Sequence, residues 1–259
     1  MAPEIDRLVL AVNDAVDSAR LSAAAGDRIV DWMVVNQLGD FLSADVLTQQ
    51  IAASRSPYRP REVVRARIHA LVEQGLVEHR GKALGASDEL QPLIRAFMDA
   101  RADAAASLWR GHEDAVDGAS RTAQALRELA SDDHVVAAAH RALPTPDDPY
   151  LRLHSRLVTL RYVRQHDHVE AWSTHGLTSA AAVAMTALWQ GEEVDPSAGL
   201  TELVSRELAT DDPASLTDSG RHMRAEIETD TNERAQAIFT ALGDKETAEF
   251  LAVLRRLPG

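Results

Sequence analysis

The chain has 259 residues, of which 45% are hydrophobic and 26% are charged, a composition typical of a soluble globular protein. Its formal net charge of −13 argues against a nucleic acid as the main partner, because proteins that bind phosphate backbones usually carry a basic surface. The absence of cysteine excludes disulfides, zinc sites with thiolate ligands and a cysteine nucleophile.

The expected location is the cytoplasm. No run of 18 apolar residues occurs, so we expect no membrane-spanning helix. The first twelve residues, "MAPEIDRLVLAV", carry acidic residues where a signal peptide needs basic ones.

Periodicity predicts an almost entirely helical chain. In the first predicted helix an apolar stripe repeats with the helical period, at Ile5, Leu8, Val9, Val12 and Val16. Ser43 is a candidate N-cap, and turn residues around Gly81 predict a two-stranded wing. The predicted helices span 4–22, 27–38, 43–53, 60–74, 88–110, 112–141, 150–174, 178–190, 200–209, 218–241 and 244–256.

Two modules are expected on either side of a linker. Residues 143–149 hold three of the ten prolines, which is typical of a connecting segment. The stretch "DRLVLAVNDAVDSA" is similar to "SRLVTLRYVRQHDH", and residues 85–109 are similar to residues 215–239. We therefore predict related modules at 1–142 and 150–259 that superpose about a pseudo-twofold axis.

The segments "GLTSAAAVAMTALWQG" and "LTDSGRHMRAEIETDTNERAQAIF" resemble the MarR-type winged-helix pattern, in which a wing leads into a long interface helix. The whole arrangement is similar to an uncharacterised actinobacterial group, the SalK-like proteins. The resemblance implies a mostly α fold, with tandem MarR-like winged-helix modules forming a single-chain pseudo-dimer and small β-wings. It also implies a small-ligand cavity between the modules.

The predicted C-terminal helix-turn-helix departs from this pattern. Only one helix fits between residues 190 and 216, so we expect the second module to lack one helix and its helix-turn-helix to be reduced. Residues 55–82 hold seven basic and three acidic residues, a local charge of +4, whereas residues 199–216 hold one basic and four acidic residues, a local charge of −3. Only the first module is expected to tolerate DNA, through Arg59, Arg61, Arg65, Arg67, Arg80 and Lys82.

The predicted helix 150–174 turns from apolar to polar along one face. At 100° per residue, Leu153, Leu157 and Leu160 share that face with the candidate catalytic residues Arg164, Asp167 and His168, while His166 points to solvent. Buried charges are costly unless they are paired. The polar group is therefore a structural network between the modules, the lining of a cavity, or a helix end that is exposed to water. In the second case the candidate ligand-binding residues are Arg161, Trp172, His154 and His175.

A metal or haem site is a weaker alternative. Six of the ten histidines lie between 134 and 175, but His166 and His168 are two residues apart and cannot face one ion from a regular helix. No phosphate loop, nucleophile elbow or dinucleotide motif occurs, so the cofactor is unknown and no metal ligands are assigned.

Three functions remain open from the sequence. We favour a small-molecule-binding protein or enzyme on a repurposed winged-helix scaffold, with a small organic ligand or substrate as partner. The alternative is a ligand-responsive, MarR-like transcriptional regulator with weak and sequence-tolerant DNA binding. The third is a structural or protein-interaction module. The chain is expected to be a monomer or a homodimer.

Overall fold

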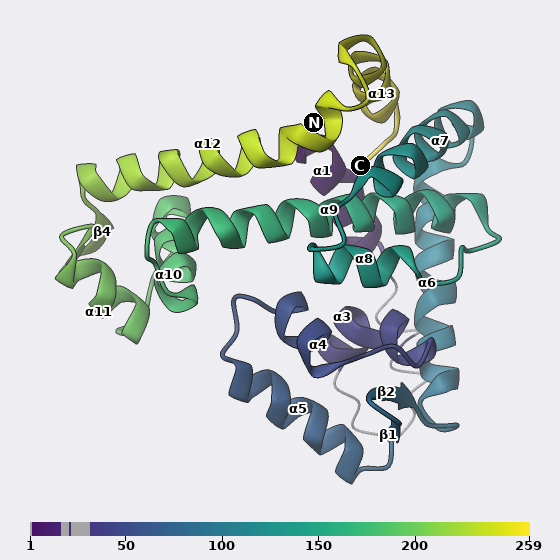
Figure 1. Ribbon diagram of the computed structural model, residues 1–259, viewed down its shortest axis with the longest axis horizontal. Coiled ribbons are helices and arrows are strands. Elements are labelled where there is room, and N and C mark those ends of the chain that lie inside the picture. Colours follow the sequence, from purple (N-terminus) through teal and green to yellow (C-terminus); the bar gives the residue numbers. More distant parts are fainter. Residues whose placement is uncertain (1, 17–20, 22–31) are drawn as a thin grey trace.

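The computed structural model describes residues 2–16, 21 and 32–259. Helices dominate the fold, and two short antiparallel hairpins complete it (Figure 1). Among the residues that the structure describes, no helix has the length and apolar character needed to cross a bilayer.

The first module contains a winged helix-turn-helix. Its elements are α3 (Trp32–Ser43), α4 (Gln49–Arg55), α5 (Arg61–Glu73), β1 (Val77–Arg80), β2 (Ala83–Ala86) and α6 (Gln91–Trp109). The Leu84 N–H donates to the Leu47 carbonyl over 2.8 Å, which attaches the hairpin to the segment before α4. Gly75 and Gly81 have φ of +70° and +65° and form the turns that end α5 and join the two strands. The wing predicted around Gly81 is present.

The cap of α4 differs from the prediction. Ser43 is the last residue of α3, and the N-cap is Thr48, whose Oγ1 accepts from the Ile51 N–H over 3.1 Å. A serine in a helix's last turn and a threonine before the next helix both fit cap statistics, so the sequence alone did not separate them. The predicted helix 27–38 lies partly outside the described residues; α3 continues past its predicted end.

The second module repeats this element order. It contains α9 (Pro149–Thr174), α10 (Ser179–Gln190), α11 (Ala198–Ser205), β3 (Ala209–Asp211), β4 (Ala214–Leu216) and α12 (Asp218–Thr240). One helix lies between residues 190 and 216, as expected, but α10 supplies the other helix of the pair. The C-terminal helix-turn-helix is therefore shortened rather than missing a helix, with 8 residues in α11 against 13 in α5.

The other helices join the modules. They are α1 (Ala2–Asp14), α7 (Glu113–Leu129), α8 (Val135–Arg141) and α13 (Asp244–Arg256). The single helix predicted over 112–141 is interrupted at Ala130–His134. There the residues "SDDH" compete with helix formation through side-chain hydrogen bonds, such as the one that the Asp133 N–H donates to Ser131 Oγ. The predicted helix 4–22 is regular only to Asp14, and part of its remainder lies outside the described residues.

Helix α9 is the centre of the molecule, and α1, α6, α7, α8 and α12 all pack on it (Figure 1). Leu153, Leu157 and Leu160 are buried, as their spacing predicted. They share one hydrophobic core with Leu8 of α1 and Phe250 of α13. Each half of the chain therefore completes the core of the other, whereas a pseudo-twofold relation between the modules stays a prediction.

Candidate functional site

Helix α5 presents a basic face to solvent. Val64, Ile68 and Leu71 repeat with the helical period and bury the opposite face against the first module's core. Arg61 and Arg65 are exposed and lie one turn apart. Arg67 is half-buried and has an interaction partner, so it belongs to the edge of this face.

The turn before α5 and the hairpin extend the basic surface. Arg59 and Lys82 are exposed, Arg59 before α5 and Lys82 at the tip of the β1–β2 turn. Arg80 is already neutralised in part, because it lies 3.0 Å from Glu78 and 3.9 Å from Asp45. Of the six arginine and lysine residues predicted to contact DNA, Arg59, Arg61, Arg65 and Lys82 are therefore the four best placed to reach phosphates.

The corresponding surface of the second module is acidic. Glu207, Asp211 and Asp212 are exposed around α11 and its hairpin. Arg206, the one basic residue here, donates to the carbonyls of His175 and Gly176 over 2.9 Å, so its guanidinium is engaged within the fold. The acidic residues are thus exposed, and their repulsion of a phosphate backbone stays a prediction.

The predicted polar group on α9 divides between two neighbours. Arg164 pairs with Glu228 at 3.0 Å, His168 Nδ1 lies 3.0 Å from Thr231 Oγ1, and His175 pairs with Asp230 at 3.1 Å. All three contacts are made to α12, because these α9 residues lie on the side that α12 covers. Burial lowers the pKa of His168 to about 4, so its imidazole is neutral at pH 7.

Asp167 points instead toward α8. Its Oδ1 lies 3.6 Å from His134 Nε2, and its Oδ2 has no hydrogen-bond partner. Burial raises the pKa of this carboxyl to about 6 and lowers that of His134, so the pair attracts weakly near neutrality. Arg164 is therefore not the partner of Asp167, and the structure does not bring the three candidate catalytic residues together.

His166 was expected to be exposed and is half-buried instead. Its ring lies 4.5 Å from the ring of His134, and its Nε2 pairs with Glu170 at 3.3 Å. The prediction was wrong because the N-terminal end of α8 covers this side of α9, and nothing in the periodicity of α9 indicates that neighbour.

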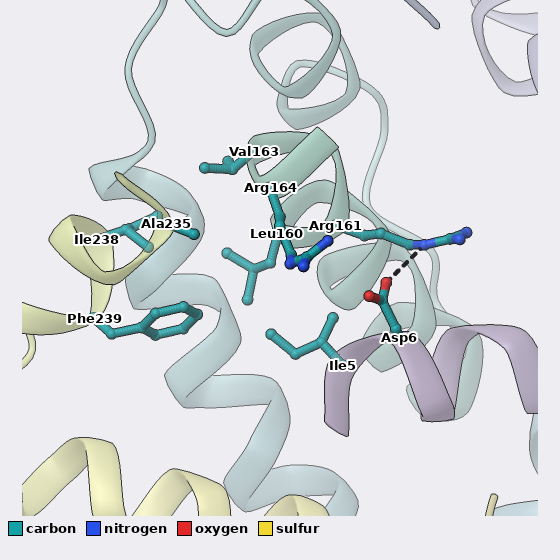
Figure 2. A pocket seen from close by; sticks show the side chains of 9 residues that line it. All are labelled: Ile5, Asp6, Leu160, Arg161, Val163, Arg164, Ala235, Ile238 and Phe239. Atoms are coloured by element: carbon teal, nitrogen blue, oxygen red, sulfur yellow. Dashed lines mark hydrogen bonds and ion pairs between the residues drawn. The ribbon is translucent and has the colours of Figure 1, made fainter. Parts of the chain in front are cut away.

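Arg161 lies at the end of an apolar hollow (Figure 2). Its Nε donates to Asp6 of α1 over 2.8 Å, and Ile5, Leu160 and Phe239 close the hollow beside it. The free volume is about 10 Å³, roughly that of a single water. Arg161 therefore links α9 to α1 through its ion pair with Asp6. The hollow is too small for an organic ligand.

His154 belongs to a buried polar cluster that the sequence did not reveal. It lies beside Asp40, Arg101 and His140, which come from α3, α6 and α8. Arg101 donates to Asp40 over 3.2 Å, and His140 Nδ1 lies 2.8 Å from Thr159 Oγ1. Although burial opposes it, Arg101 and His140 hold the pKa of Asp40 well below its usual range. One signal was present: Arg101 interrupts the apolar stripe of Phe97, Ala100, Ala104 and Ala105.

The cluster borders a cavity of about 410 Å³ that the linker 143–149 partly covers. His154 is 1% exposed, burial lowers its pKa to about 3, and its Nε2 has no partner. The cavity is therefore lined in part by a buried, neutral imidazole with one unpaired ring nitrogen. Among the described residues, no three histidine or carboxylate side chains converge in the manner of a metal site.

The sequence matches the model of a family described as a helix-turn-helix family over residues 94–258. The matched segment includes α10 and α11 and most of the long helices, and α4 and α5 lie before it. No curated protein and no solved structure gives a significant match.

Proposed function

The chain belongs to this helix-turn-helix family, whose match begins after α5 and the β1–β2 hairpin. From the residues that those elements expose, we propose that the protein binds duplex DNA through α5 and the β1–β2 hairpin as a ligand-responsive transcriptional regulator. The observation that carries the proposal is the solvent-facing set Arg59, Arg61, Arg65 and Lys82 on a complete winged helix-turn-helix. A second helix of such a pair enters the major groove in proteins of this architecture, and arginines flanking it bind phosphates.

The proposal assigns DNA binding to one face of the molecule. The surface around α11 carries exposed carboxylates where α5 carries arginines, so it contributes repulsion rather than contacts. A single basic face predicts modest affinity, because few phosphates are neutralised, and for the same reason it predicts a shallower log–log salt slope than two equivalent basic faces would give.

The function favoured from the sequence alone depended partly on a missing C-terminal helix, and the presence of α10 and α11 removes that support. What still favours a small-molecule site is the cavity beside Arg101, His140 and His154, where Nε2 of His154 has no hydrogen-bond partner. Catalysis by Arg164, Asp167 and His168 stays a prediction, and their separation over two neighbouring helices weighs against a common reacting centre.

The test is a titration of fluorescent duplex DNA at several salt concentrations, followed by anisotropy. We expect Arg61→Ala and Arg65→Ala each to weaken binding uniformly across DNA sequences, and each to reduce the log–log salt slope by about 1 because one phosphate contact is lost.

Arg256→Ala is the matched control, since Arg256 is exposed on α13 at the far end of the molecule from α5 (Figure 1). It removes the same charge and is expected to leave the slope unchanged. If Arg256→Ala weakens binding as much as Arg61→Ala does, the attraction is a property of net charge and the proposal for α5 is wrong.

A further inference from the structure

The loop that follows α10 and the β3–β4 hairpin line a groove on the surface of the second module. Its volume is about 480 Å³. Leu188 of α10 and Ala214 of β4 give it apolar walls. Three carboxylate residues line the same groove: Glu192, Glu193 and Asp195. A groove with both apolar walls and negative charge suits a protein surface that carries positive charge and apolar side chains.

The carboxylates of this groove are not used within the fold. All three are exposed, and no described side chain forms an ion pair or a hydrogen bond with them. Glu207 and Asp211 are also exposed and extend the negative charge around α11. The cations that would neutralise this surface therefore have to come from another molecule.

A large aromatic side chain lies at the same end of α10. Trp189 follows the lining residue Leu188 in the sequence and is 52% exposed, more than any other large hydrophobic side chain that the structure describes. Tryptophan is enriched among the residues that contribute most to protein–protein binding. An exposed tryptophan next to an apolar groove therefore favours a protein as the occupant.

The first module carries the complementary charge. Arg61 and Arg65 of α5 and Lys82 of the wing are exposed, and within the described part of the chain none of them has an ion-pair partner. Val63 of α5 adds an apolar side chain that is 39% exposed. The α5 surface thus combines positive charge with apolar area, and the groove combines negative charge with apolar area.

The two surfaces do not neutralise each other within one molecule. A cleft of about 450 Å³ lies between the α4–α5 turn and the α9–α10 junction, and the α4–α5 pair and α10 lie on either side of it (Figure 1). Arg61 lines this cleft, but no aspartate or glutamate does. On the α9 side, Trp172 is 8% exposed and packs in the second module's core.

We propose that the groove binds the α5 surface of a second copy of this chain. Arg61 and Arg65 of one copy lie against the groove of the next, where they pair with Glu193 and Asp195. A second copy fits better than an unrelated basic protein, because both surfaces belong to one chain and are always present in equal amounts. The contact joins two different surfaces, so a dimer keeps one free surface of each sign, and association continues head to tail into a ring or an open chain.

The salt dependence of association tests this contact in the absence of DNA. Each copy has a formal net charge of −13, so non-specific repulsion weakens, and association improves, as salt is added. Complementary contacts have the opposite dependence. In sedimentation velocity we expect self-association at about 0.1 M salt and its loss at about 1 M, where the Debye length falls from about 10 Å to about 3 Å. Monomers at both salt concentrations, or association that increases with salt, overturn the proposal.

Two neutralised variants identify the surfaces. Arg61→Gln with Arg65→Gln removes charge from α5. Glu193→Gln with Asp195→Asn removes it from the groove, and all four side chains are exposed, so the core is unchanged. Each variant alone should associate at least roughly tenfold more weakly than the wild type. A mixture should form a dimer with one copy of each variant and grow no further, because only one intact surface of each sign remains. If the mixture associates no better than the separate variants, the assigned contact is wrong.

Arg121→Gln with Arg256→Gln is the matched control. Both arginines are exposed, on α7 and α13, and their loss changes the net charge as the α5 variant does. This control should associate as the wild type does. A loss equal to that of the α5 variant would show that net charge, and not the α5 surface, governs association.

Addition of a short duplex DNA to the assembled protein is the last measurement. The duplex should dissociate the assembly, because it occupies α5; this competition alone rests on the proposed function. If the protein assembles and binds no duplex, the proposed function fails while the head-to-tail contact stands. If it binds the duplex and never assembles, the head-to-tail contact fails while the proposed function stands. An assembly that binds the duplex without dissociating would show that α5 is not the shared surface.

Discussion

Asp167 is the buried carboxyl group whose environment most disfavours its charge. Its neighbour His134 is neutral near pH 7 because burial lowers the pKa of the imidazole. The Oδ2 atom of Asp167 accepts no hydrogen bond. Because the pKa of Asp167 rises from 3.8 to about 6 on folding, its contribution to stability is complete below pH 4 and is lost as the pH rises through 6.

Asp167→Asn should therefore stabilise the protein at pH 7.5 and have little effect at pH 4. The expected gain is roughly 2–3 kcal/mol, which corresponds to the shift in pKa. Urea unfolding of wild type and variant at the two pH values measures it. A constant difference between the proteins at both pH values would show that Asp167 is not the titrating group.

The burial of the α9 side chains shows what helical periodicity can predict and what it cannot. The helical projection correctly placed Leu153, Leu157, Leu160 and Asp167 inside. It could not indicate which helix would cover each side, so the division between α12 and α8 was not foreseen. The cluster around Arg101 and His154 was missed for a related reason, because its members come from four helices that are distant in sequence.

At the scale of elements, the packing of α10 against α11 depends on a glycine. A Cβ at Gly199 would lie 2.2 Å from the backbone oxygen of Ala180, and backbone cannot move aside as a flexible side chain can. Gly199→Ala should destabilise the C-terminal helix-turn-helix by about 1–3 kcal/mol through overpacking.

Gly118→Ala is the control for this substitution. Gly118 lies within α7, and its added Cβ would meet Val253 at 3.8 Å, an ordinary contact. This variant should be stabilised by about 0.5–1 kcal/mol through helix propensity. Thermal unfolding of the two variants measures both effects. If Gly199→Ala matches Gly118→Ala, α10 and α11 do not approach as closely as the structure indicates.

Most elements followed from local sequence signals. The ends of α12 and α13 lie within one residue of their predicted positions, since Thr217 caps α12 and Gly243 precedes α13. The wing followed from Gly81. Local signals failed at two places. Ser43 and Thr48 are both acceptable N-caps, so the sequence did not show which of them begins α4. The residues "SDDH" can continue a helix or interrupt it, so the break between α7 and α8 was not predicted. The relation of the modules in space has no local signal, because helix packing between distant segments decides it.

At the scale of the whole molecule, the N- and C-terminal ends of the chain hold each other. Arg7 of α1 donates to the carbonyls of Leu254, Leu257 and Gly259 over 3.1–3.2 Å. Trp109 Nε1 donates to the Pro258 carbonyl over 3.0 Å. The hydrophobic core on α9 also takes residues from both halves. The linker therefore joins two parts that are already in contact along α1, α7, α9 and α13.

Cutting the linker should leave the molecule assembled. A protease site inserted between Pro144 and Thr145, which are both exposed, allows cleavage without disturbing either module's helices. We expect the cleaved protein to elute as one species in gel filtration and to separate only in denaturant, because the shared core and the Arg7 contacts persist. Two separate peaks in native buffer would show that the halves are independent domains.

The opposite charges around α5 and α11 have an evolutionary consequence. In a homodimer every substitution occurs twice, so a carboxylate that enters one DNA-binding surface enters the other as well. Here the two helix-turn-helix units lie in one chain, and Glu207 or Asp211 can arise beside α11 while Arg61 and Arg65 of α5 stay unchanged. Selection can then act on each unit separately. The resulting molecule has two unlike helix-turn-helix surfaces. A duplex that binds to the basic surface therefore meets no equivalent second surface, in contrast to a duplex bound by a symmetric homodimer.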